Sequence, residues 1–251
     1  MRVAIVIPAR YASSRLPGKP LLKATGKYLI QHVYERALDA KCASDVIVAT
    51  DDDRIAEAVR SFGGRVAMTR ADHPSGTDRV AEVAAGLAAD AVINLQGDEP
   101  MLEAETLDEL AGLLERDPGS SMATLAVPIA GKDVYLSPNV VKVVCDDRGR
   151  ALYFSRSPIP MVRDGEPDFA ARPARFLQHL GLYAYRREFL LKLAATAPHP
   201  LEESEKLEQL RVLGTGAAIQ VGIVPHAHRG VDTPADYDAF VRSYRDKKRA
   251  A

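Results

Sequence analysis

Short apolar runs and amphipathic segments alternate through the first half of the chain. The apolar runs are continuous rather than alternating, which is typical of strands that are buried on both faces. They predict strands at residues 3–7, 46–50, 66–68 and 91–95. Apolar residues at helical spacing follow each run and predict helices at about residues 28–40, 53–61, 78–88 and 104–116. This alternation predicts a doubly wound parallel sheet.

The second half of the chain has a different pattern. Strands are predicted at residues 122–128, 140–146, 151–155 and 177–185, with few helices between them. We therefore expect antiparallel additions, and overall an α/β fold with a mixed, mainly parallel central sheet. Further on, the pattern predicts helices at about 188–195, 203–213 and 236–244 and a strand at 219–224. A stretch rich in proline and charge between Arg156 and Arg175 predicts a long irregular loop, which we interpret as a substrate lid or a subunit contact.

Composition narrows the class of protein. The 251 residues are 47% hydrophobic and 27% charged, as in a globular chain, and we expect one domain. No apolar run is long enough to span a bilayer, and the N-terminus lacks the regions of a signal peptide, so we expect a cytoplasmic protein with no membrane partner. A net charge of −1 argues against nucleic-acid binding, because domains that bind nucleic acids are usually basic.

A basic loop follows the first predicted strand. Arg10, Arg15 and Lys19 lie within the segment Pro8-Ala9-Arg10-Tyr11-Ala12-Ser13-Ser14-Arg15-Leu16-Pro17-Gly18-Lys19-Pro20. In open α/β sheets, ligands bind at the carboxyl ends of the strands, and these cations suit a phosphate chain there. The segment has neither the P-loop pattern nor the dinucleotide-binding glycine pattern. The alternative is a solvated basic loop.

Two carboxylates are candidates for a divalent ion. Asp98 follows the predicted strand at 91–95, where it would face the basic loop. The alternative is that Asp98 or Glu99 only caps the turn before the next helix. Thr233 and Pro234 have the pattern of a helix N-cap and first turn. Asp232 precedes them and is not part of that capping motif. It is a weaker candidate for a second metal carboxylate.

Other polar segments have a structural and a functional interpretation. Ser75 and Gly76 precede a helix, where Ser75 could cap it or the pair could offer a hydroxyl and backbone N–H groups to a base or phosphate. His179 and Tyr183 share one face of a predicted strand, and a strand histidine is usually a hydrogen-bonded core residue. The segment Glu208-Gln209 lies in a predicted amphipathic helix and could simply be a solvated face.

Several of these segments together resemble the 3-deoxy-manno-octulosonate cytidylyltransferases (CMP-KDO synthetases) over nearly the full chain. Besides the basic loop, they are Thr69-Arg70-Ala71-Asp72-His73 with Ser75-Gly76-Thr77, Gln96-Gly97-Asp98-Glu99-Pro100, Leu152-Tyr153-Phe154-Ser155-Arg156, His179-Leu180-Gly181, Leu207-Glu208-Gln209-Leu210-Arg211 and Gly230-Val231-Asp232-Thr233-Pro234. The resemblance implies an enzyme that joins CTP to the acid sugar KDO and releases pyrophosphate, for lipopolysaccharide synthesis. It also implies a nucleotidyltransferase-type three-layer sandwich, a single domain over residues 1–251, and a homodimer with an irregular loop and dimerisation region around 130–180.

The resemblance assigns roles to individual residues. Lys19, Asp98 and Asp232 resemble the catalytic residues, and the two aspartates resemble ligands of Mg²⁺. The implied nucleotide site consists of Ala9, Arg10, Arg15, Lys19, Ser75 and Gly76. The implied sugar site consists of Gln96, Arg156, His179, Tyr183, Glu208 and Gln209. His179 is the nearest candidate for a general base. Transfer to 8-amino-KDO or another acid sugar, and a nucleotide-binding domain without turnover, remain alternatives.

Overall fold

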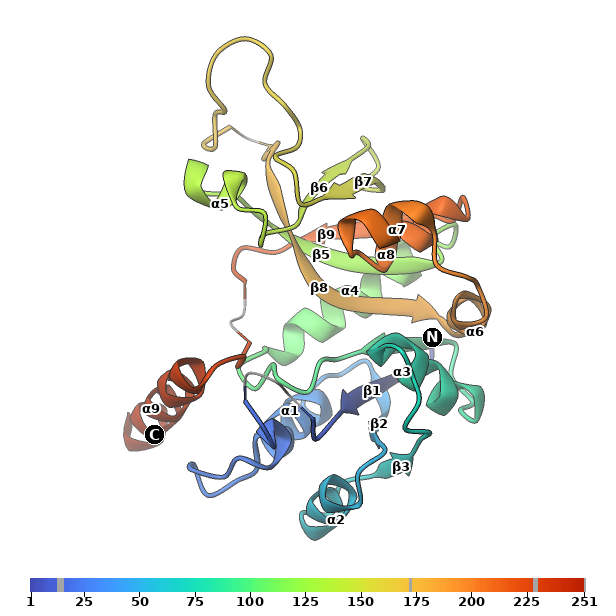
Figure 1. Cartoon of the computed structure of the whole chain (residues 1–251), viewed down its shortest axis with the longest axis vertical. Helices are drawn as coiled ribbons and strands as arrows, with labels where there is room; N and C mark the ends of the chain where they lie inside the picture. The colour runs from blue at the N-terminus through green and yellow to red at the C-terminus, as the bar shows by residue number, and fades with distance from the viewer. Residues whose placement is uncertain (13–15, 172, 228–229, 251) are drawn as a thin grey trace. The chain divides into compact units, whose positions relative to one another are not determined.

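The computed structural model describes residues 1–12, 16–171, 173–227 and 230–250. Contacts within the chain define two compact units. Unit 1 comprises Met1–Asp108 and His228–Ala251, and unit 2 comprises Glu109–Ala227. Figure 1 shows the elements of both units with their labels.

Unit 1 contains four parallel strands in the spatial order β3-β2-β1-β4. They are β1 (Val3–Ala9), β2 (Ala43–Thr50), β3 (Val66–Met68) and β4 (Ala91–Asn94). In the central strand, Ile5 pairs with Val46 on one side and with Ile93 on the other. Residues 3–7 are almost completely buried, as the continuous apolar run predicts. The expected parallel strands of the first half are confirmed.

Helices α2 (Asp53–Ser61) and α3 (Gly76–Ala85) of unit 1 begin at side-chain caps. Asp52 accepts a hydrogen bond from the Arg54 backbone N–H at the start of α2, and Ser75 accepts one from the Asp78 N–H at the start of α3. The elements are the short 3₁₀ helix η1 (Lys19–Leu21), α1 (Leu29–Leu38), α2 (Asp53–Ser61), α3 (Gly76–Ala85), the start of α4 (Ala104–Arg116) and α9 (Pro234–Ala250).

The C-terminal helix α9 packs on the first helix of unit 1. Its residues Tyr237, Phe240 and Val241 share a buried cluster with Leu29. The ring of His32 makes an edge contact with Phe240, with ring centroids 5.0 Å apart. The C-terminal helix therefore belongs to the same unit as β1 and the basic loop that follows it.

Unit 2 combines parallel and antiparallel pairing. β5 (Met122–Pro128) pairs antiparallel with β8 (Leu177–Arg186) and parallel with β9 (Ile219–Ile223). β6 (Lys142–Cys145) pairs antiparallel with both β7 (Ala151–Ser155) and β8. The expectation of antiparallel strands in the second half is confirmed.

The helices of unit 2 differ from the sequence prediction in two places. The chain forms a short helix α5 (Lys132–Leu136) that the pattern did not predict, whereas α6 (Arg187–Ala194) agrees with it. The single helix expected at 203–213 is wrong, because the chain forms α7 (Pro200–Glu205) and α8 (Gln209–Gly214). Lys206 ends α7 in the left-handed region, with φ of 55°. Arg211 of α8 then donates to the carboxylate of Glu202 in α7 over 2.7 Å.

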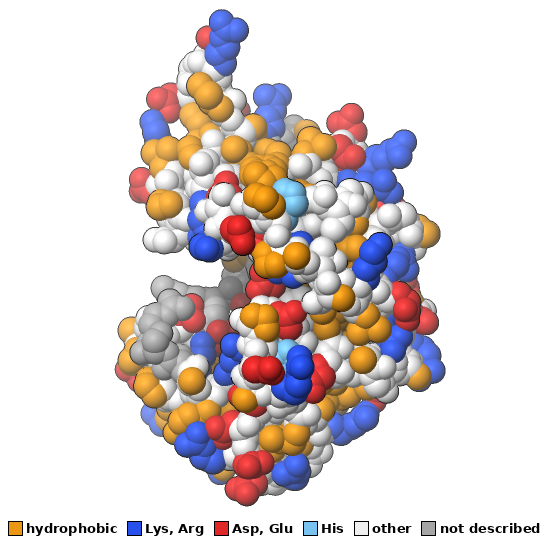
Figure 2. Space-filling model, turned by 45° about the vertical axis from the view of Figure 1, so that its right-hand side comes forward, with side chains coloured by type: hydrophobic (Ala, Val, Ile, Leu, Met, Phe, Trp, Pro, Cys, Tyr) orange, Lys and Arg blue, Asp and Glu red, His pale blue; other side chains and the backbone are white. Residues whose placement is uncertain are grey.

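The segment from residue 156 to 176 contains no helix or strand in its described part, as expected. It forms the yellow loop at the top of Figure 1. A small cluster of Ile129, Tyr135 and Phe176 anchors it, and Val162 packs against this cluster. Met161 remains 80% exposed. In Figure 2 the narrow projection at the top carries hydrophobic side chains below a basic tip. Among the described residues, no helix combines the length and apolar character that crossing a membrane requires.

Candidate active site

The basic loop of unit 1 is closed by its own backbone. Gly18 N–H donates to the carbonyl of Tyr11 over 3.2 Å. Gly18 has φ of 66°, a left-handed conformation that favours glycine, and it precedes η1, which begins with Lys19. The ring of Tyr11 lies under the guanidinium of Arg54, 3.3 Å from its central carbon. These contacts place Lys19 at the carboxyl edge of the sheet. Arg15 lies outside the described residues.

Lys19 forms ion pairs with Asp98 and Asp232, the two predicted metal ligands. Its Nζ lies 2.7 Å from Asp98 Oδ2 and 3.4 Å from Asp232 Oδ1. Asp98 follows β4, and Asp232 precedes α9. A backbone hydrogen bond of 2.8 Å from Val231 N–H to the carbonyl of Asp98 holds the two segments together. The structure thus brings together the three residues to which the family resemblance assigns a catalytic role.

Glu99 belongs to the same cluster, and sequence reasoning gave it only a capping role. Burial, together with the nearby carboxylates of Asp98 and Asp232, raises the pKa of Glu99 to about 7. The only sequence signal was its position next to Asp98. The described residues contain no group of three or more His, Cys, Asp or Glu side chains suited to hold a metal ion. Asp98 and Asp232 nevertheless fit a divalent ion, because they already share one cationic group and magnesium commonly takes one or two carboxylates plus phosphates and water.

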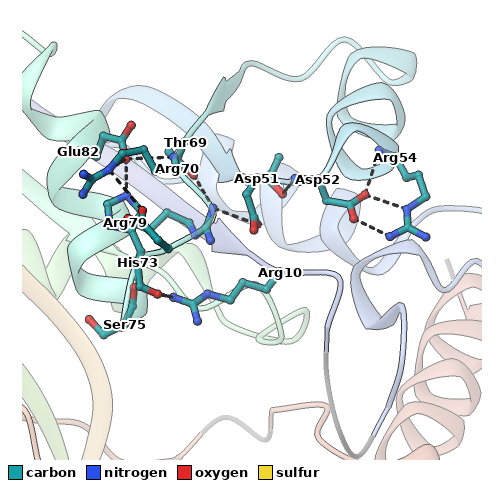
Figure 3. Close-up of polar contacts among 12 residues, drawn as sticks. Arg10, Asp51, Asp52, Arg54, Thr69, Arg70, His73, Ser75, Arg79 and Glu82 are labelled. Atoms are coloured by element: carbon teal, nitrogen blue, oxygen red, sulfur yellow. Dashed lines mark hydrogen bonds and ion pairs between the residues drawn. The ribbon is translucent and has the colours of Figure 1, made fainter.

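Arg10 connects the end of β1 to the loop before α3 (Figure 3). Its Nη2 donates to the carbonyls of His73 and Ser75 over 2.8 and 2.9 Å. The Ser75 hydroxyl donates to Asp78 Oδ2 over 2.7 Å and accepts from the Asp78 N–H, so it acts as the helix cap. Gly76 is the first residue of α3, next to Pro8 of β1. The structure therefore brings Arg10, which follows Ala9, together with Ser75 and Gly76, whereas the side chain of Lys19 contacts Asp98 and Asp232.

Behind this loop lies a charged cluster that sequence reasoning missed (Figure 3). Arg79 of α3 is completely buried and lies 3.1 Å from Asp51, which follows β2. The same Nη1 also contacts the Thr69 hydroxyl, which follows β3. His73 contacts Glu82 on the next turn of α3. Arg79 thus ties the ends of two strands to the helix that begins beside the predicted nucleotide site.

In unit 2, His179 is a buried, neutral histidine. Burial lowers its pKa to about 3. Its Nε2 lies 2.9 Å from Thr124 Oγ1, and that hydroxyl also faces the carbonyls of Leu180 and Leu182. A hydroxyl has one proton to donate, and the carbonyls can only accept, so the ring donates from Nε2. A pKa this low disfavours the general-base role that the resemblance left open for His179.

Tyr183 of β8 contacts both His179 and Gln209, the first residue of α8. The rings of His179 and Tyr183 lie 5.5 Å apart by centroid, which confirms that they share a face. The Tyr183 hydroxyl donates to Gln209 Oε1 over 3.3 Å. Gln209 is only 3% exposed, and its Nε2 has no hydrogen-bond partner among the described residues. A buried amide donor without a partner is costly, and a polar ligand would satisfy it. Glu208 precedes α8 and is exposed.

Arg156 is held at both its backbone and its side chain. Its backbone N–H donates to Glu205 Oε2 over 2.9 Å, and its Nε donates to the Glu205 carbonyl over 2.8 Å. Its Nη1 donates to the Pro138 carbonyl over 3.1 Å. A guanidinium has five N–H donors, so three remain on Nη1 and Nη2 for a ligand. Gln96 lies in unit 1, where its amide donates to Asn94 over 3.2 Å, whereas the other five predicted sugar residues belong to unit 2.

Comparison with known proteins identifies the class. A family model described as cytidylyltransferase matches residues 4–219. The 3-deoxy-manno-octulosonate cytidylyltransferase of Geobacter metallireducens is 54% identical over 246 residues, which cover 96% of this chain and 97% of that protein. The protein of the same name from Geobacter sulfurreducens is 51% identical over 250 residues, which cover 98% of this chain and 100% of that protein.

Among solved structures, that of a CMP:2-keto-3-deoxy-manno-octonic acid synthetase complexed with CTP matches with a TM-score of 0.91 at 46% identity. The match covers 98% of this chain and 100% of that one. The chain belongs to the cytidylyltransferase family and, within it, to the 3-deoxy-manno-octulosonate cytidylyltransferases. The expected three-layer α/β fold with a mixed, mostly parallel sheet is confirmed.

Proposed function

We propose that the protein transfers CMP from CTP to the anomeric hydroxyl of 3-deoxy-D-manno-octulosonate (KDO) and releases pyrophosphate. The observation that carries the proposal is the meeting of Lys19, Asp98 and Asp232 at the carboxyl edge of the unit 1 sheet. One cation and two carboxylates at that edge suit a nucleoside triphosphate. The family of the chain and its similarity to a synthetase complexed with CTP support the choice of nucleotide.

In this proposal, unit 1 binds the nucleotide. Two of the three ammonium donors of Lys19 point to Asp98 and Asp232, which leaves the third for a phosphate oxygen. Arg10 and, by family resemblance, Arg15 add charge to the triphosphate site. The remaining residues proposed to contact the nucleotide are Ala9, Ser75 and Gly76. Fixed cations lower the barrier because negative charge accumulates on the departing pyrophosphate.

Asp98 and Asp232 would hold Mg²⁺. When bound, the ion would lower the pKa of the attacking sugar hydroxyl and neutralise charge on the α-phosphate. The two carboxylates contribute the anionic charge that binds it, and Lys19 balances that charge when the ion is absent.

The acid sugar is assigned to Gln96, Arg156, His179, Tyr183, Glu208 and Gln209. KDO carries one carboxylate and several hydroxyls, so it needs a planar cationic fork and neutral hydrogen-bonding groups. Arg156 retains three N–H donors, and Gln209 presents a buried amide nitrogen without a partner. His179 is neutral and contributes binding rather than proton transfer, because its pKa lies near 3.

We also propose that the protein is a cytoplasmic homodimer that serves lipopolysaccharide synthesis, with the region around 130–180 at the dimer contact. Leu136 of α5, Leu152 of β7 and Met161 of the following loop are 51%, 62% and 80% exposed, and exposed large apolar side chains of this kind suit an interface. Light scattering of the purified protein tests the dimer. A Met161→Glu variant should shift the mass toward the monomer.

The deciding experiment measures pyrophosphate release from CTP with Mg²⁺, in the presence of KDO, of 8-amino-KDO, of sialic acid, or of no sugar. Release that requires KDO and gives CMP-KDO supports the proposal. Preference for 8-amino-KDO or sialic acid would assign another acceptor. No release with any sugar, together with CTP binding, would indicate a nucleotide-binding protein without turnover.

A further inference from the structure

Lys142 is a completely buried lysine at the start of β6. Its ammonium group donates to the carbonyls of Ser137 and Val140 over 2.9 and 2.7 Å, and to the carbonyl of Arg156. An ammonium has three N–H donors, so these carbonyls use all of them. Lys142 therefore has no donor left for a substrate.

Burial of a lysine costs free energy of folding unless partners compensate its charge. Lysine is almost never fully buried without a partner, because burial removes the hydration of its charge. Here burial lowers the pKa of Lys142, which is the expected sign of that cost. Three carbonyl dipoles and the nearby carboxylate of Glu205 offset it.

The contacts of Lys142 fix both the backbone and the surroundings of Arg156. The carbonyl of Arg156 is bound by Lys142, and its N–H is bound by Glu205, so both of its backbone polar groups are held. Pro138 lies in the same turn as Ser137 and Val140, and its carbonyl accepts from Arg156 Nη1. Lys142 thus binds both the residue that carries the guanidinium and the turn that orients it.

We propose that Lys142 is a positioning residue that sets the direction of the Arg156 guanidinium toward the carboxylate of the acid sugar. The proposal rests on the proposed function, in which Arg156 binds that carboxylate. A bidentate contact depends on the direction of the fork, so a small displacement of Arg156 weakens sugar binding while the nucleotide site in unit 1 keeps its groups.

The test compares Lys142→Met with Arg186→Met. Arg186 is a matched control, since it also donates to three backbone carbonyls of unit 2, those of Leu114, Asp117 and Ser120, and none belongs to a proposed site residue. Both variants should lower the melting temperature. We expect Lys142→Met to raise the KM for KDO by about tenfold or more, with the KM for CTP within about twofold. Arg186→Met should leave both KM values near those of the wild type.

A double variant tests whether Lys142 acts through Arg156. In an Arg156→Lys background, Lys142→Met should add little to the KM for KDO, because the fork that Lys142 positions is already lost. If Lys142→Met does not fold, Lys142→Gln replaces it, since its amide keeps two donors. An unchanged KM for KDO in the folded variant, or equal increases for both substrates, overturns the proposal.

The wild-type assay separates this proposal from the proposed function. If the wild type uses another acid sugar, the two variants are compared with that sugar. The KM values for that sugar then test the positioning role of Lys142. If the wild type turns over no acid sugar, the function and the inference fail together. If it uses KDO and the folded Lys142 variant behaves like Arg186→Met, only the inference fails.

Discussion

Arg79 and Asp51 form an ion pair of 3.1 Å in which the guanidinium is completely buried, whereas the Asp51 side chain is 24% exposed. Nε and Nη2 of Arg79 have no hydrogen-bond partner among the described residues. The guanidinium therefore combines the contacts of Nη1 to Asp51 and Thr69 with two buried nitrogen atoms that lack a partner among these residues. Substitution of Asp51 and substitution of Arg79 should therefore change the free energy of unfolding by different amounts.

The first prediction is that Asp51→Ala destabilises the protein more than Arg79→Met. Removing the carboxylate leaves a buried, uncompensated cation, which costs about 3 kcal/mol. Replacing the arginine with methionine removes that cation and its unsatisfied donors, so the cost is smaller. Chemical denaturation measures both free energies of unfolding. The double variant should be close to Arg79→Met, and a double variant as unstable as the sum of the two would contradict this account.

Asp98→Asn should leave folding nearly intact and lower kcat by about 10²-fold or more, because a group that stabilises transition-state charge is lost. Steady-state pyrophosphate release at varied Mg²⁺ measures the effect. Asp39→Asn is the control, since the Asp39 side chain is 62% exposed and lies in a surface pair with Arg36. Full activity of the Asp98 variant would remove the metal assignment.

Lys19→Ala should reduce kcat/KM for CTP by about 2–4 kcal/mol in free energy, the scale of one electrostatic contact to the transition state. It should also increase the rise in melting temperature on adding Mg²⁺. Without the ammonium, Asp98 and Asp232 repel each other and bind a cation more tightly. Calorimetry with and without Mg²⁺ checks this. An Mg²⁺ effect equal to that of the wild type would show that Lys19 does not compete with the ion.

Arg156→Lys should raise the KM for KDO strongly and change the KM for CTP little. The guanidinium of Arg156 donates to the carbonyls of Glu205 and Pro138, and a lysine cannot reproduce the planar fork that would also bind the proposed sugar carboxylate. Arg163→Lys is the matched control, because its side chain is 92% exposed. Equal increases in both KM values would mean that Arg156 supports the nucleotide site instead.

Stability should fall as the pH is lowered from about 6.5 to about 4, in part because of His32. Burial lowers the pKa of His32 to about 4 from 6.5, so in this range the unfolded chain takes up a proton that the folded protein does not. The contribution is complete above pH 6.5 and levels off below pH 4. His32→Gln keeps a hydrogen-bonding group for the Thr25 hydroxyl, 2.7 Å from His32 Nε2, but does not titrate. Its melting temperature should depend less on pH, and parallel curves for the two proteins would contradict the assignment.

Local pattern was sufficient for most elements. The predicted ranges 53–61, 66–68, 104–116 and 122–128 agree with α2, β3, α4 and β5. Apolar periodicity and the caps Asp52 and Ser75 act within a few residues, so the sequence displays them directly. The basic loop and Asp98 could likewise be assigned to the carboxyl edge, because each follows a recognisable strand.

The pattern failed where side-chain contacts or backbone conformation, rather than apolar periodicity, decided the outcome. Residues 203–213 have helical periodicity, but the left-handed Lys206 and the pairing of Glu202 with Arg211 produce two helices. Lys142 lies within the apolar run predicted as a strand at 140–146, and the apolar pattern does not show that its ammonium group binds the carbonyls of Ser137, Val140 and Arg156. Glu99 acquired its raised pKa only through burial beside Asp98 and Asp232.

The sequence by itself determined the alternation of strands and helices, the basic character of the first loop and, through resemblance, the family. The tertiary structure decided which charges meet. Lys19 lies 213 residues from Asp232 along the chain, and the packing of α9 on α1, with the hydrogen bond from Val231 to Asp98, accompanies an approach of their charged atoms to 3.4 Å. Spacing along a chain fixes local periodicity, but contacts between distant residues form only when buried surfaces align, so the candidate site required the folded molecule.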